Sequence, residues 1–159
     1  MNQVRNIVWW LCFIITAVCV QTLVPCLDVL VAGLFILLQE RDYKNMLWLL
    51  PLFVLIQEGA GTRLFGGAIV WYCAVIIFFK IGHWLFEVEN FIFIFLLSGC
   101  LVAPYYAINW LMAPLQNLPF DTRDTLDKAL LQALFLPLVW RFLVITRRRK
   151  IKADKNETQ

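Results

Sequence analysis

The sequence predicts an all-α, polytopic membrane protein with six transmembrane helices joined by short loops. Of its 159 residues, 62% are hydrophobic and only 16% are charged, whereas an average soluble domain is about 45–50% apolar and about 25% charged. The mean hydropathy is +0.75, and the apolar residues stand in long runs. This composition argues against a soluble enzyme, a nucleic-acid-binding protein and a disordered regulator, because a water-soluble globule of this size cannot bury so much apolar surface.

The chain length limits how the spans are arranged. A transmembrane helix needs about 20 residues, so six spans take up about 120 residues and leave about 39 for the loops and both ends. No room remains for a folded soluble domain. We therefore expect one transmembrane domain over residues 1–145, followed by a basic tail over residues 146–159.

The first three expected spans cover residues 7–24, 27–38 and 46–56. Pro25 closes the first span, because proline cannot continue a regular helix without losing a hydrogen bond. The second and third runs are short, and apolar runs of about 10–14 residues are often broken or only partly inserted. Whether these two segments cross the membrane completely stays open at the level of sequence.

The last three expected spans cover residues 68–81, 91–112 and 128–145. The fourth has room to extend to residue 86, since the residues after it stay largely apolar. A polar connector precedes the sixth span, and Asp124 and Thr125 are the residue types that cap a helix N-terminus.

The orientation follows from the basic residues at the end of the chain. Arg147, Arg148, Arg149 and Lys150 directly follow the sixth span, and lysine and arginine that flank spans stay in the cytoplasm. With six spans, the N-terminus is then cytoplasmic too. The same charges attract anionic lipid head groups, and beside an apolar segment we interpret them as a topology signal and not as a nucleic-acid site.

Asp28 is the first polar residue that draws attention, near the expected outer mouth of the second span. An ionisable residue within a span is by default a hypothesis of function, because placing it in hydrocarbon costs free energy. The alternative is that Asp28 caps the second helix beside the interface, since it follows Pro25 in an order typical of a helix start. Both interpretations stay open.

A glycine-rich segment over residues 57–67 is the most informative stretch of the chain. Glycine permits backbone conformations that are closed to other residues, and irregular backbone at membrane depth must be buried in protein or line a wet cavity. One interpretation is a partner or ligand site in which Glu58 and Arg63 neutralise each other, and the other is an ordinary outer loop. The candidate residues are Glu58, Gly59, Gly61, Arg63 and Gly66.

The residues offer no catalytic, cofactor or metal constellation. His83 is the only histidine, and the five cysteines include no C-x-x-C pair, which is the spacing that zinc and thioredoxin-like chemistry use. We therefore predict that the chain is not an enzyme and holds no cofactor.

Two local patterns and the overall layout resemble one family of membrane proteins. Pro25-Cys26-Leu27-Asp28 resembles a proline–aspartate start of an early helix in that family. Leu55-Ile56-Gln57-Glu58, followed eight residues later by Gly66, is similar to a stretch that leads into a Leu-Gly before the next span. With the six short-looped spans and the basic tail, these patterns resemble the MreD family, in which aspartate usually stands at the position of Glu58.

The resemblance implies a non-catalytic scaffold of the bacterial cell-elongation (rod) complex, in the cytoplasmic membrane. Such a scaffold binds an MreC-like membrane protein and links peptidoglycan synthesis to the MreB cytoskeleton. The family's fold is similar to that of the substrate-binding subunits of energy-coupling-factor transporters. A subunit of that kind, binding a vitamin or a metal, is the second interpretation, and a membrane enzyme acting on lipid-linked substrates is the third.

Overall fold

The computed structural model describes residues 3–25, 27–41, 43–59, 66–85, 91–115 and 120–156, and every regular element in these ranges is an α-helix. The predicted all-α class is therefore confirmed for the described residues. The helices are α1 (Gln3–Leu23), α2 (Leu30–Glu40), α3 (Tyr43–Gly59), α4 (Gly67–Leu85), α5 (Phe91–Cys100), α6 (Val102–Leu115) and α7 (Thr122–Asn156).

Among the described residues, four stretches of helix, and not the six predicted, are long and apolar enough to cross a membrane, which supports the coarser prediction of a membrane protein. One of them is formed by α5 and α6 together, which join through a turn at Leu101, so the expected fifth span is one stretch with a break near Pro104. The four stretches are Asn6–Leu23, Gly67–Trp84, Phe91–Leu115 and Thr122–Arg147.

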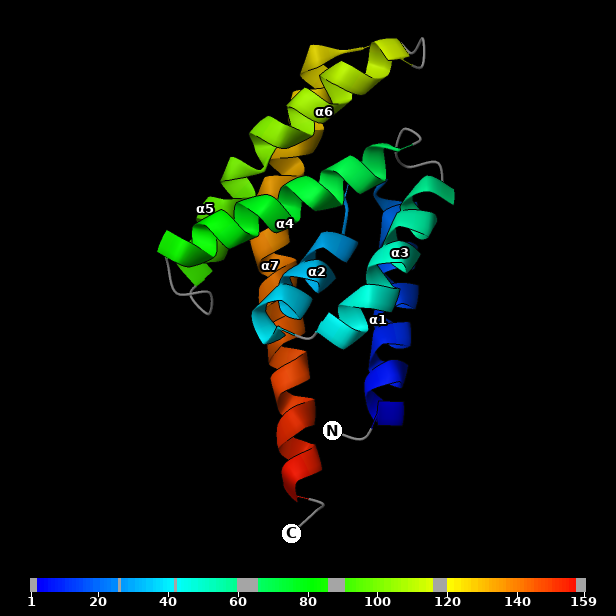
Figure 1. Ribbon diagram of the computed structural model, residues 1–159, viewed down its shortest axis with the longest axis vertical. Helices are drawn as coiled ribbons and strands as arrows, with labels where there is room; N and C mark the ends of the chain where they lie inside the picture. The colour runs from blue at the N-terminus through cyan, green and yellow to red at the C-terminus, as the bar shows by residue number, and fades with distance from the viewer. Residues whose placement is uncertain are drawn as a thin grey trace.

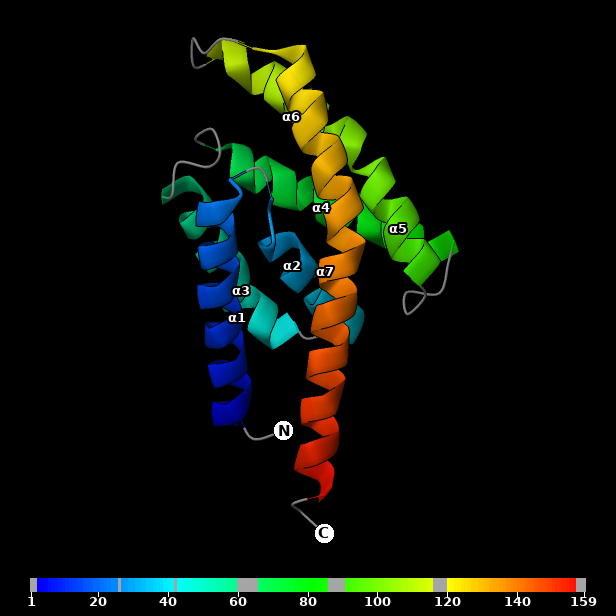
Figure 2. The same cartoon turned by 180° about the vertical axis from the view of Figure 1, so that it is seen from behind.

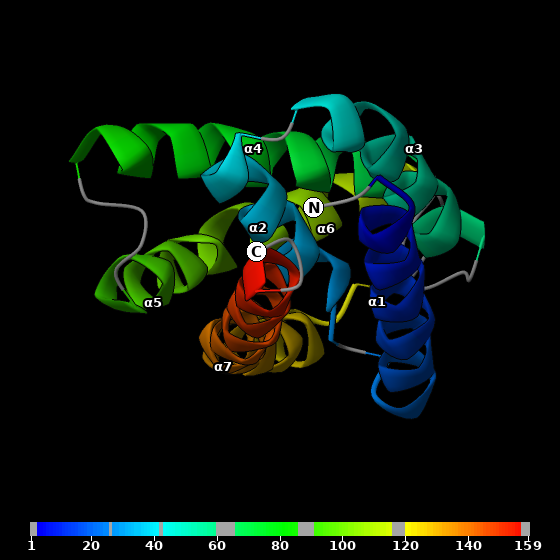
Figure 3. The ribbon, with the colours of Figure 1, turned by 90° about the horizontal axis from the view of Figure 1, so that it is seen from below.

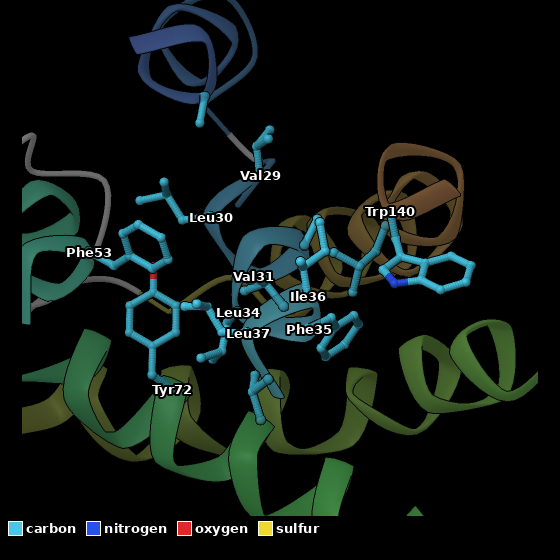
Figure 4. Close-up of a cluster of buried hydrophobic side chains, with 14 of the residues drawn as sticks. Val29, Leu30, Val31, Leu34, Phe35, Ile36, Leu37, Phe53, Tyr72 and Trp140 are labelled. Carbon is cyan, nitrogen blue, oxygen red and sulfur yellow. The ribbon is translucent and has the colours of Figure 1, made fainter. Parts of the chain in front are cut away.

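The second expected span forms a short helix in the centre of the bundle. α2 has 11 residues and is about 16 Å long, about half of the roughly 30 Å of a hydrocarbon core. Every residue from Leu30 to Leu37 is buried, and Figure 4 shows side chains of α2 facing Phe53, Tyr72 and Trp140 from three other helices. α2 is thus a buried core helix, and its apolar run does not cross the membrane by length.

The other helices surround α2. α7 packs against α2, α5 and α6, and α4 packs against α2, α3, α5 and α6. Seen from below in Figure 3, α2 lies between α4, α7 and α1. The start of α1 and the end of α7 lie at the same end of the molecule (Figure 1). α3 has 17 residues, or about 25 Å, so it too is shorter than a full crossing.

α1 approaches α2 closely at a glycine. A Cβ atom built on Gly33 would lie 2.5 Å from the Cε1 atom of Phe13, which is closer than such atoms approach in proteins. The ring of Phe13 is itself held against Trp9 at 5.9 Å and Phe53 at 6.3 Å between centroids. The absence of a side chain at Gly33 therefore sets the spacing between α1 and α2.

The boundaries of α7 differ from the sequence prediction at both ends. Its N-terminal cap is Asp121 and not Asp124 or Thr125, because the Asp121 Oδ1 atom accepts the backbone N–H groups of Arg123 at 2.9 Å and Asp124 at 3.4 Å. At the other end α7 runs past residue 145 to Asn156. The start of the predicted tail is therefore a continuation of the last helix.

Candidate functional site

Asp28 is the centre of a buried polar cluster. Its side chain is 5% exposed, and it accepts hydrogen bonds from four side chains of three helices. The donors to Oδ1 are the Gln57 Nε2 atom at 2.7 Å, the Gln21 Nε2 atom at 3.4 Å and the Tyr72 hydroxyl at 3.4 Å, and the donor to Oδ2 is the Trp71 Nε1 atom at 3.1 Å.

The local chain conformation explains why Asp28 is inside the bundle. α1 ends at Leu23, and α2 begins further down inside the bundle (Figure 1). The N-cap of α2 is Val29, with no capping bond from a side chain. The interpretation of Asp28 as a helix cap is therefore wrong. Its carboxylate instead accepts hydrogen bonds from side chains of other helices.

The cluster ties distant parts of the chain together. Gln21 belongs to α1, Gln57 to α3, and Trp71 and Tyr72 to α4. Hydrogen bonds to an ionised acceptor are roughly twice as strong as neutral ones, and a buried carboxylate is costly unless it is fully hydrogen-bonded. The position of Asp28 thus favours one arrangement of α1, α3 and α4 around the start of α2.

Glu58 closes the glycine-rich loop that the sequence singled out. Its Oε1 atom accepts the backbone N–H of Gly66 at 2.9 Å. Gly66 has φ of +77°, a conformation that favours glycine because it has no Cβ atom. Gly59 is exposed at the end of α3, whereas Gly61 and Arg63 lie outside the described residues, as does the expected pairing of Glu58 with Arg63.

A second polar cluster lies where α2 ends. Arg147 of α7 donates from Nε and Nη2 to the two carboxylate oxygens of Glu40, and from Nη1 and Nη2 to the Asn6 Oδ1 atom at 3.4 Å. Its guanidinium carbon lies 4.6 Å from the ring centroid of Trp9 and 5.1 Å from that of Trp10. Arg147, predicted as part of a basic tail, is therefore buried and joins α7 to α1 and α2.

Further contacts reinforce this end of α2. The Trp140 Nε1 atom donates to the Gln39 Oε1 atom at 3.0 Å, and the Arg41 Nη2 atom lies 3.3 Å from the His83 Nε2 atom. Arg148, Arg149 and Lys150 continue α7 beyond this cluster. The polar residues at the end of α2 thus reach α4 and α7 directly, and α1 through Arg147.

A cavity of about 260 Å³ lies beside Asp28, and Gln132 of α7 also lines it. Gln132 is 5% exposed, and neither its Nε2 nor its Oε1 atom has a hydrogen-bond partner. Buried amides are normally hydrogen-bonded. Gln132 is therefore an unexplained polar group at the edge of the Asp28 cluster.

Sequence reasoning identified Asp28 and Glu58 but missed their partners and Gln132. A signal was present, because Gln21 and Gln132 interrupt apolar runs and Gln57 directly precedes Glu58. Trp71 and Tyr72 carried no such signal, since tryptophan and tyrosine are common near membrane interfaces.

The comparisons with known proteins add no assignment: no family model, no curated protein and no solved structure matches this chain. The function therefore has to be argued from the two clusters. Asp28 has both carboxylate oxygens bonded to side chains of its own chain, an arrangement suited to holding helices in place.

Proposed function

We propose that this chain is a non-catalytic integral membrane scaffold, similar to the MreD family, that serves the bacterial cell-elongation complex. In this proposal it lies in the cytoplasmic membrane with both ends in the cytoplasm. It binds an MreC-like membrane protein and links peptidoglycan synthesis to the MreB cytoskeleton, so that its loss changes cell shape.

The closed hydrogen-bond network at Asp28 is the observation that carries this proposal. Four donors from α1, α3 and α4 converge on one carboxylate, so the polar residues best placed for chemistry are engaged within the chain. Glu58 is likewise engaged, with the backbone of Gly66. A frame whose polar groups bond to one another leaves its apolar outer surfaces for partners, as a scaffold requires.

The orientation is supported by the basic residues. Arg41 follows the end of α2, Lys44 lies at the start of α3, and Arg147 lies in the last third of α7. Contacts of Arg41 and Arg147 join the end of α2 to α1, α4 and α7. Since basic residues flanking spans stay in the cytoplasm, this end is the cytoplasmic one in our proposal.

The proposal is tested in a rod-shaped bacterium that carries the gene. Depletion should produce round cells, and the tagged full-length protein should co-purify with an MreC-like protein from detergent extracts. Asp28→Leu should fail to restore the rod shape. Asp124→Leu is the matched control, because Asp124 is half exposed and pairs with Lys128 of its own helix. Normal shape on depletion, with no MreC-like protein recovered, would contradict the proposal.

A substrate-binding subunit of an energy-coupling-factor transporter is the second candidate. The observation that favours it is the buried Gln132 amide without a partner beside a cavity of about 260 Å³, because small-molecule sites combine apolar walls with a few polar groups. A vitamin or metal retained by the purified wild-type protein and lost from Gln132→Leu would favour this candidate. Its absence from both proteins would exclude it.

A further inference from the structure

α1 and α7 run alongside each other and are joined through Arg147, and the space between them is a groove. Figure 2 shows the two helices side by side, with α2 behind them. A cavity of about 540 Å³ is lined by residues of α1, from Trp9 to Val20, and by residues of α7, from Phe135 to Thr146. We call this cavity the α1–α7 groove. It adjoins the smaller cavity beside Asp28, because Val20 and Phe135 line both.

The lining of the groove is mostly apolar. Its polar side chains besides Trp9 and Cys12 are Thr16 and Thr146, and their hydroxyls donate to backbone carbonyls of their own helices, 2.8 Å to Cys12 and 2.9 Å to Phe142. None of the described residues that line it is charged. Leu138 and Phe142 stay exposed, so the groove opens to its surroundings, and a hydrocarbon occupant fits this chemistry.

The length of the groove matches one lipid chain. From Phe135 to Thr146, α7 rises about 17 Å, which is close to the roughly 15 Å of one leaflet of a hydrocarbon core. The lining along this length is mostly apolar. An extended acyl chain therefore fits the length and the lining of the groove.

The charges at one end of the groove specify the head group. The groove ends at Thr146, where the run Arg147, Arg148, Arg149 and Lys150 begins. Arg147 is paired with Glu40, and the sequence places three more basic residues directly after it. Basic residues beside a membrane segment attract anionic lipids.

We propose that the α1–α7 groove binds one acyl chain of an anionic phospholipid, from the leaflet at which the two chain ends lie. The head group lies beside the basic residues 148–150, and the chain extends along α7 toward Phe135. The lipid fills the space between two helices that the rest of the fold holds apart. This inference stands independently of the proposed scaffold function.

The test uses the full-length protein in nanodiscs with equal amounts of phosphatidylcholine and phosphatidylglycerol, followed by native mass spectrometry. The wild-type protein should retain phosphatidylglycerol. Thr16→Trp fills the groove from α1 and should lower retention about tenfold, which corresponds to about 1.4 kcal/mol. Ile15→Trp is the matched control, since Ile15 is exposed on the same helix and does not line the groove.

A second pair of variants guards against a folding defect in α1. Leu138→Trp fills the groove from α7, and Leu134→Trp is its control, because Leu134 is equally exposed on α7 but lies outside the lining. Both members of each pair should keep the wild-type elution volume and melting temperature. Loss of lipid in Leu138→Trp but not in Leu134→Trp would then support the proposal.

The head-group part is tested by changing Arg148, Arg149 and Lys150 together to glutamine. The preference for phosphatidylglycerol over phosphatidylcholine should disappear. Equal retention of both lipids by the wild-type protein would overturn the proposal, as would unchanged retention in Thr16→Trp and Leu138→Trp. Unchanged lipid together with loss of an MreC-like partner in these two variants would assign the groove to a partner helix instead.

Discussion

The two ends of α2 are held by different kinds of polar contact. Before its start, Asp28 is buried and receives hydrogen bonds from amide, indole and phenol groups of α1, α3 and α4. At its end, Glu40 meets the opposite charge of Arg147 from α7. The Glu40 side chain is 33% exposed, whereas Asp28 is 5% exposed. The start of α2 is held by buried hydrogen bonds to Asp28, and its end by an ion pair whose carboxylate is partly exposed.

This difference shows how a short helix organises a membrane bundle. α2 is too short to cross, so its length alone does not determine its depth. Asp28 fixes its start against three helices, and Glu40 fixes its end against Arg147 of the last helix, which also bonds to Asn6 of the first. Because a buried hydrogen-bonded carboxylate tolerates change less than a partly exposed ion pair, we expect the Asp28 end to be the less replaceable of the two.

The largest effect is expected from Asp28→Leu. It removes the common acceptor of four side chains and leaves buried donors unpaired, at about 1–3 kcal/mol each, which should lower the free energy of unfolding by about 3–5 kcal/mol. Unfolding of the full-length protein in mixed micelles measures this. Asp124→Leu, at an exposed position, should change it by less than about 0.5 kcal/mol. Equal effects of the two substitutions would show that the Asp28 cluster does not hold the bundle.

Arg147→Met should have the second largest effect. It leaves Glu40 without its partner but accessible to water, so the loss should be about 2 kcal/mol by the same measurement. Arg123→Met, at an exposed position of α7, is the control. Combining Glu40→Arg with Arg147→Glu should recover part of the loss, because the charge pair is restored in reverse. A loss larger than that of Asp28→Leu would reverse the comparison between the two ends.

Gly33→Ala probes the packing between the two ends of α2. The added Cβ atom meets the Phe13 ring at 2.5 Å, and overpacking of this kind costs about 1–3 kcal/mol. We expect a loss of about 1 kcal/mol, since the contact is with the tip of a ring. Phe13→Leu in the same chain should relieve part of it. Gly99→Ala is the control because a Cβ atom there meets no neighbour within 4 Å.

Gln132→Leu should have the smallest effect, and one of opposite sign. Replacing a buried amide that has no partner by an apolar side chain of similar shape should stabilise the protein by up to about 1 kcal/mol. Gln39→Leu makes the contrast, because Gln39 accepts from Trp140 at 3.0 Å and its loss should destabilise. Destabilisation by Gln132→Leu would indicate that the amide has a bound partner when the protein is in a membrane.

Part of the candidate site could be predicted from sequence, because a charged residue beside an apolar run costs free energy wherever the other helices lie. Asp28 and Glu58 stand beside long apolar runs, so each is conspicuous without knowledge of the fold. Their roles could not be predicted, since the partners Gln21 and Trp71 come from residues 7 before and 43 after Asp28 in the chain. An aspartate just before α2 suits either a helix cap or an acceptor for three other helices, so the sequence does not distinguish the two roles.

The composition and the hydropathy runs determined by themselves that this chain is an all-α membrane protein, because helix formation in an apolar solvent satisfies the backbone locally. Tertiary structure alone decided that α2 is a core helix, that Arg147 is a buried clamp and that α1 and α7 enclose a groove. These features depend on which helices lie next to one another, and long-range packing leaves no trace in the local pattern of apolar residues.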